Sequence, residues 1–171
     1  MTCNPMGNPM KTTTRLLLIA CLALPFLAAC KKEEAPKVEV AAALTAPTTS
    51  DEAAWNAYIT DVVTRHADGA TGMYAYTLPA PDSPDFQGYY DRQLEKAQVD
   101  VARGGTEGTL LAFASPSSAK SADLAVASFA NAEPGTMKGV RVLFLGDAAD
   151  SERVKAAVEP TGATFQFVEA K

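Results

Sequence analysis

The stretch Thr-Leu-Leu-Ala-Phe-Ala at residues 109–114 decides the fold of this 171-residue chain. Such a short and nearly continuous apolar run is typical of a strand that is buried on both faces of a parallel sheet. A second run of this kind occupies residues 140–145. Between the two runs, Ala122, Val126 and Phe129 fall at helical spacing. The segment therefore predicts a β-α-β unit.

Helices and strands alternate through the rest of the chain after residue 50. A capping box, Thr49-x-x-Glu52, opens a predicted helix over residues 51–67. The other predicted elements are a strand over residues 73–78, a helix from residue 86 to the Gly104-Gly105 pair, a helix that starts at Ser115-Pro116, a helix capped by Asp150 or Ser151 that runs through Val158, and an edge strand around residues 165–169.

This order of elements predicts an α/β fold with a small four-stranded, mostly parallel sheet and helices on both faces. An α+β arrangement with one antiparallel strand is the alternative, and the pattern leaves the strand order open.

Charge and rare residues limit the chemistry that the chain can perform. The formal net charge is −5, which disfavours a nucleic-acid partner because phosphates are neutralised by basic patches. All three cysteines lie within the first 30 residues, so the predicted domain has no thiol catalysis, no disulfide and no cysteine zinc site. The single histidine excludes a multi-histidine metal site. We therefore expect no metal, no cofactor and no enzymatic activity.

The first 30 residues have the pattern of an export signal. Lys11 and Arg15 precede an uncharged apolar run at residues 16–26, which is too short to span a bilayer. The Leu-Ala-Ala-Cys sequence that ends at Cys30 resembles the lipobox of bacterial lipoproteins. Met10 begins a normal signal sequence and is the expected initiator, whereas the preceding nine residues suit no signal region.

The resemblance implies that Cys30 is acylated and that the peptide before it is removed. Two or more acyl chains anchor a protein stably, so no transmembrane helix is needed. Lys31 and Lys32 follow the cysteine, and in Gram-negative lipoproteins a lysine there implies sorting to the outer membrane, facing the periplasm. The expected location is therefore the cell envelope, with a lipid anchor in the outer membrane.

Three segments follow from this reading. Residues 1–29 form the signal peptide, residues 30–50 form the lipidated cysteine and a flexible linker, and residues 51–171 form the periplasmic domain. The linker has balanced charges, two prolines and no aromatic residue. The domain has 10 basic and 17 acidic side chains, a net charge of −7, so it is more acidic than the whole chain.

Tyrosines and acids gather around a proline-punctuated loop at residues 79–85 and form the first candidate site. Tyrosine is enriched in protein interfaces because it supplies a large contact area at low entropic cost. The alternative for these tyrosines is core packing with the hydroxyls at the rim. The predicted partner-binding residues are Tyr74, Tyr76, Asp82, Asp85, Tyr89 and Tyr90.

Two further candidates have simple structural alternatives. A weaker candidate ligand site consists of Ser117, Ser118 and Asp147, which lie where strands end and helices begin. Ser117 and Ser118 suit a small anion. The alternative is that these residues form plain caps and turns. His66 continues the apolar stripe of the first helix. It is either a general base partnered by Asp61 or Asp68, or a residue at the edge of the core near the helix end.

The sequence leaves three functions open, in this order. The first is a non-enzymatic, envelope-tethered module that binds a protein, as an inhibitor, an immunity protein against an incoming toxin, or an assembly accessory. The second is a small-ligand-binding domain. The third is a serine hydrolase that uses His66.

Overall fold

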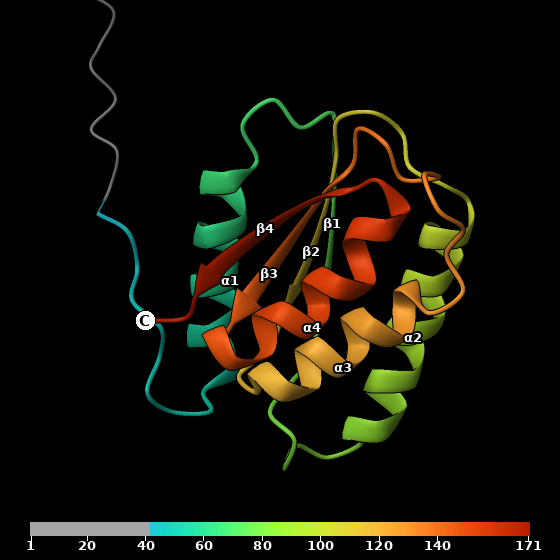
Figure 1. Ribbon diagram of the computed structural model, residues 1–171. Coiled ribbons are helices and arrows are strands. Elements are labelled where there is room, and N and C mark those ends of the chain that lie inside the picture. The colour runs from blue at the N-terminus through green and yellow to red at the C-terminus, as the bar shows by residue number, and fades with distance from the viewer. Residues whose placement is uncertain (1–41) are drawn as a thin grey trace, which may run out of the picture. The chain divides into compact units, whose positions relative to one another are not determined.

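Four parallel strands form one sheet in the order β1-β2-β3-β4 in the computed structural model, which describes residues 42–171 (Figure 1). The strands are Gly72–Thr77 (β1), Thr109–Ala114 (β2), Arg141–Gly146 (β3) and Thr164–Glu169 (β4). The helices are Glu52–His66 (α1), Phe86–Ala102 (α2), Ser118–Phe129 (α3) and Ala148–Val158 (α4), and a 3-10 turn, Glu159–Thr161 (η1), follows α4. The α/β prediction is confirmed. Every strand pair is parallel, so the alternative with an antiparallel strand is excluded.

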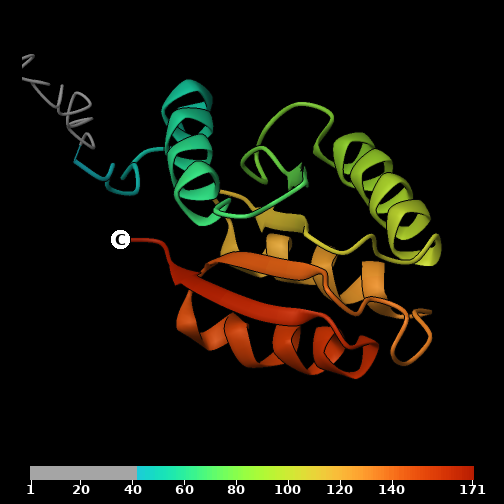
Figure 2. The same ribbon diagram turned by 90° about the horizontal axis from the view of Figure 1, so that it is seen from above.

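Three of the four helices cover the same face of the sheet. Each of α2, α3 and α4 connects one strand to its immediate neighbour. Since β-α-β crossovers share one hand, consecutive neighbours place every crossover helix on one side. Figure 2 shows α1 apart from this layer, on the other face.

The larger part of the core lies under α2, α3 and α4. Phe113 is fully buried at its centre, where its ring stacks on Tyr76 at 4.9 Å and meets Phe129 at 6.1 Å between centroids. The register places Phe144 beside Phe113 and Phe167 beside Phe144, so aromatic rings continue across the sheet. Burial of these rings is a main source of stability.

Among residues 42–171, α1 is the only helix on the opposite face. Its buried residues Trp55, Ile59 and Val62 pack over apolar side chains of β2 and β3. The carboxyl end of α1 is fixed by Arg141, whose guanidinium donates to the carbonyls of His66 at 3.0 Å and Asp68 at 2.9 Å. A cation at this end also interacts favourably with the helix dipole.

Residues just before α1 belong to the folded domain. Leu44 N–H donates to the Asp61 carboxylate, and Ala46 N–H donates to the carbonyl of Lys171. The Trp55 indole donates to the carbonyl of Thr49 at 2.8 Å. The predicted linker, residues 30–50, therefore overlaps the domain at its carboxyl end. The signal peptide, Cys30 and the first part of the linker lie outside the described residues.

Three predicted helix caps differ from the observed ones, although the predicted extent of α1, residues 51–67, is close to the observed one. Asp51, rather than the Thr49-Glu52 box, caps α1 by accepting from Ala54 N–H at 2.7 Å. Ser115 accepts from Ser117 N–H instead of opening α3. The fourth helix begins after Asp147, so Asp150 lies in its first turn. Among residues 42–171 no helix is long and apolar enough to cross a membrane.

Replacing Arg141 with methionine tests how α1 is held. Arg141→Met keeps the aliphatic length and removes both hydrogen bonds to the end of α1, so we expect a loss of about 1–3 kcal/mol in the free energy of unfolding. Urea unfolding of both proteins measures the loss. Arg103→Met is the matched control, because Arg103 is exposed and its ion pair with Asp100 at 3.7 Å contributes under about 1 kcal/mol. Equal losses in the two variants would contradict the prediction.

Candidate functional site

Strand β1 is a sheet edge without the usual protection. Edge strands commonly carry charged residues or proline, which prevent another chain from pairing with them. The sequence of β1, Gly-Met-Tyr-Ala-Tyr-Thr, contains neither. Met73 is 55% exposed, Tyr74 is 44% exposed and Ala75 is also exposed. The edge therefore presents uncharged, partly apolar side chains to solvent.

The free hydrogen-bonding groups of β1 belong to alternate residues. Leu78 N–H donates to the carbonyl of Ala114, which fixes the alternation. In a parallel ladder, residues two apart bond to the same neighbour, so Tyr74 and Tyr76 bond to β2. The N–H and C=O groups of Met73, Ala75 and Thr77 consequently point away from the sheet. Their side chains lie on the face that α1 covers.

A groove of about 370 Å³ runs between α1 and β1. Its floor contains the three residues whose backbone groups are free, and its wall is the outer flank of α1. No lining residue is charged. The lining residues are Asn56, Ile59, Thr60, Val63, Thr64, Met73, Ala75 and Thr77.

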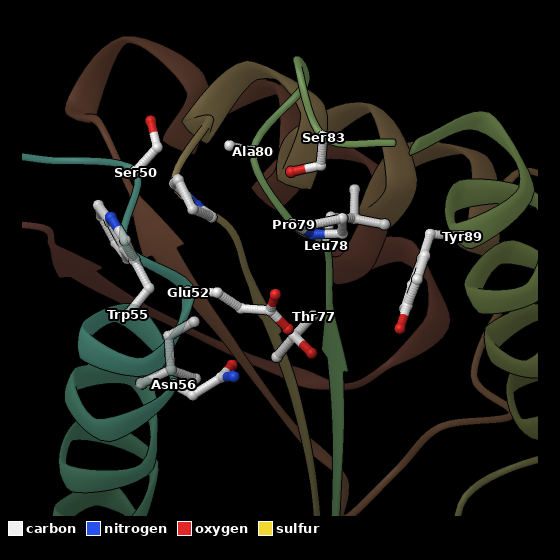
Figure 3. Close-up of a pocket in the computed structure, with 12 residues that line it drawn as sticks. Ser50, Glu52, Trp55, Asn56, Thr77, Leu78, Pro79, Ala80, Ser83 and Tyr89 are labelled. Atoms are coloured by element: carbon white, nitrogen blue, oxygen red, sulfur yellow. The ribbon is translucent and has the colours of Figure 1, made fainter. Parts of the chain in front are cut away.

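A smaller pocket of about 50 Å³ continues this groove beyond the carboxyl end of β1 (Figure 3). The two share Asn56, Ile59 and Thr77. Trp55 and Tyr89 stand on opposite sides in Figure 3, and Glu52 extends from α1 toward Thr77. Among residues 42–171, Glu52 is the only charged residue of the lining. The volume holds a few water molecules or the end of one side chain, and is too small for a typical small-molecule ligand.

The predicted tyrosine and acid cluster lies partly at this pocket. Tyr89 lines it and is 45% exposed, whereas Tyr90 is partly buried against the core on the other face of α2. Asp82 and Asp85 are exposed on the loop that carries Ser83 of the lining. The Asp85 carboxylate pairs with Arg92 at 3.2 Å, and that guanidinium also lies over the Tyr89 ring.

Tyr76 does not belong to a surface, which corrects the prediction made for it. Its side chain is fully buried, and its hydroxyl donates to the Asp100 carboxylate at 2.7 Å. Burial and this hydrogen bond both raise the pKa of Tyr76 far above its usual range. Lys96 lies over the rings of both Tyr76 and Tyr74. Strand alternation predicts the shared face of the two tyrosines but not their different depth.

The helix start at Ser118 is occupied by the protein's own groups. Ser118 is buried, its hydroxyl donates to Asp150 at 2.6 Å, and it accepts from Asp147 N–H at 2.7 Å. Gly146 permits this approach, because a Cβ there would lie 2.6 Å from the hydroxyl. The Asp150 carboxylate would repel an anion. The predicted anion role of Ser118 is therefore wrong. Of the other two predicted residues, Ser117 caps α3 without a side-chain hydrogen bond, and Asp147 is exposed.

His66 has a local structural role in the described part of the chain. Its Nδ1 lies 2.8 Å from the carbonyl oxygen of Val62, so this nitrogen donates to the backbone one turn earlier. Asp61, one of its two predicted partners, instead accepts from Arg65 and Leu44. The pairing of His66 with Asp61 is wrong. Among residues 42–171, no group of three histidines or carboxylates can hold a metal ion.

Comparisons with known proteins identify no relative of this chain. No family model, no curated protein and no solved structure matches the chain. The sheet also lacks the crevice where open α/β folds usually bind ligands, because the order β1-β2-β3-β4 has no point at which it reverses. The groove beside β1 is thus the strongest candidate site. Sequence reasoning missed its α1 wall, and the lack of charge in β1 was the available signal.

The serine network at α3 and α4 predicts two effects on stability. Ser118→Ala removes hydrogen bonds to Asp147 and Asp150, so we expect a loss of about 1–3 kcal/mol in the free energy of unfolding. Ser117→Ala is the control, since its side chain makes no cap bond, and a change under about 0.5 kcal/mol is expected. Thermal unfolding with a matched urea series measures both.

Asp150 adds a pH dependence with a defined sign. Burial opposes its ionisation, but hydrogen bonds from Ser118 and Arg153 outweigh it and hold the pKa of Asp150 below its ordinary value of 3.8. The stabilisation is therefore present above that value and lost as pH falls through the lower folded pKa. We expect the stability difference between wild type and Asp150→Asn to shrink below about pH 4. A constant difference down to acid pH would contradict this.

Proposed function

We propose that this protein is a non-enzymatic, envelope-tethered lipoprotein whose domain binds another protein through the groove between α1 and β1. One observation carries the proposal: β1 is an exposed sheet edge without a charge or a proline, and it borders a groove without a charged residue. Unpaired strand edges and exposed apolar patches are typical of surfaces that another chain covers.

The tether part of the proposal rests on the residues that end at Cys30. An acylated Cys30 would hold the acidic domain at the outer membrane on the periplasmic side, where it could act as an inhibitor, an immunity protein or an assembly accessory. The domain would be carried away from the lipid, since its net charge of −7 gives no attraction to anionic head groups.

Two other functions have less support. The pocket at the carboxyl end of β1 has about 50 Å³, and the Ser118 helix start is filled, so neither of these two places offers a binding site for a small ligand. A serine hydrolase would need His66 to face a serine and a carboxylate. Its Nδ1 is engaged with the backbone carbonyl of Val62.

A lysine placed in the groove tests the binding surface. Met73→Lys puts a charge in the neutral groove while changing a side chain that is 55% exposed, so we expect unchanged stability and at least a fivefold loss of partner capture from an envelope extract. Val99→Lys is the matched control, because Val99 is 51% exposed on α2 and lies outside the groove lining. Equal capture by the wild type and both variants would refute the proposed surface.

The lipid anchor is tested separately at Cys30. Cys30→Ala removes the sulfur that would carry the acyl chains, so the protein should move from the membrane fraction to the soluble periplasmic fraction. Fractionation with metabolic labelling by a palmitate analogue measures this, and Cys21→Ala is the control that should leave labelling intact. Labelling that persists in Cys30→Ala would overturn the assignment.

A further inference from the structure

We propose that the partner contributes an extended segment that pairs as a fifth strand with β1 and places a lysine or arginine in the pocket at Glu52. This inference deepens the proposed function and rests on it. It names both the conformation and the chemistry of the segment that the groove accepts.

The backbone of β1 provides the first argument. Met73, Ala75 and Thr77 direct their N–H and C=O groups away from β2, so six hydrogen-bonding groups are available along one strand. No other strand of the described chain pairs with this edge. Addition of a strand to an exposed edge satisfies such groups directly, and gives affinity that does not depend on the partner's side chains.

The groove provides specificity at alternate positions. In a segment paired with β1, every second side chain lies on the α1 face. Those side chains would meet Ile59, Val63 and neutral threonines, so small or medium apolar residues fit them. The intervening side chains face the other side of the sheet, where Tyr74 is exposed and Lys96 lies over its ring. We therefore expect alternation between apolar and polar residues.

The pocket at the end of the groove provides the charge. A long basic side chain would extend its methylene groups along Leu78 and Pro79 and bring its charged end to Glu52, the only charged residue there. Trp55 adds aromatic surface that favours a cation, whereas the Tyr89 ring already lies beside the Arg92 guanidinium. Asp82 on the adjoining loop, and the domain's net charge of −7, favour the same sign, whereas the carboxylate of Asp85 is already paired with Arg92.

A second copy of this chain fits the groove poorly. Pairing of β1 with a second β1 would bring no basic residue to Glu52, because β1 carries no charge at all. Two domains of net charge −7 would also repel each other. The occupant that satisfies both the edge and the pocket is therefore a different, basic segment.

Selection of peptides on the protein itself tests the proposal, because the groove chooses the sequences that fit it. Random peptides of about 12 residues, long enough for one added strand, are selected on the immobilised full-length protein. We expect enrichment of sequences with alternating apolar residues and a lysine or arginine at one end. Absence of enrichment, or enrichment of acidic or helix-periodic peptides, would overturn the proposal.

Backbone methylation then tests the strand itself. Two versions of one selected peptide carry N-methyl groups on alternate amides, in opposite phase. In an added strand only one phase points at β1, so one version should lose about tenfold or more in affinity and the other should bind as the parent does. Equal effects of the two phases would overturn strand pairing.

Glu52→Gln tests the charge in the pocket. It should lower the affinity for the selected basic peptides about fivefold or more. Peptides in which norleucine replaces the basic residue should bind to both proteins equally. Glu95→Gln, an exposed change on α2, is the control and should have no effect. Equal binding to wild type and Glu52→Gln would overturn the anchor.

If Met73→Lys abolishes partner capture while the methylation phases do not differ, the proposed function stands and the strand mode fails.

Discussion

The sequential order of the four parallel strands is the constraint on which the rest of the structure depends. Crossovers of one hand between immediate neighbours must all lie on the same side of the sheet, so α2, α3 and α4 form one layer. Among the helices of residues 42–171, only α1, which precedes the first strand, lies on the other face. A helix is about 10–12 Å across, whereas four strands spaced about 4.8 Å apart are wider. One helix cannot cover that face from edge to edge.

The placement of α1 decides which edge stays open. Arg141 fixes its carboxyl end near the start of β3, and its apolar face packs on β2 and β3. On the β4 side, residues before α1 occupy part of this face: Ala46 bonds to Lys171 and, like Val168, packs against the core under α1. Charged Glu169 and Lys171 also protect that end of β4. Nothing comparable covers β1 in the described chain, and the groove is the result.

The sequence predicts the elements of this fold much better than their mutual arrangement. Residues 109–114 and 140–145 identify buried strands because two-sided burial requires an apolar run. Strand order depends on contacts between distant segments, and no local pattern encodes it. The groove exists because the strand order places β1 at the edge of the sheet, beside α1. The sequence therefore predicts β1 itself but not the α1 wall of the groove.

The candidate site shows the same limit at single residues. Tyr74 and Tyr76 share a face and a residue type, yet one is exposed and the other is buried beside Phe113. Tyr76 stacks on Phe113 of β2 and donates to Asp100 of α2, and such contacts between distant segments are a tertiary property. Ser118 resembles an anion-binding helix start until Asp150, from another helix, accepts its hydroxyl hydrogen. Local capping rules describe a helix end but not what the neighbouring helix brings to it.

An open, uncharged strand edge carries a risk of aggregation, because it can pair with any extended chain. Here the risk is limited by two features of the same domain. The edge is only six residues long, and the net charge of −7 of residues 51–171 repels further copies. The same net charge attracts segments of the opposite sign. Edge and acidity together therefore favour a basic extended partner over both a second copy and an acidic chain.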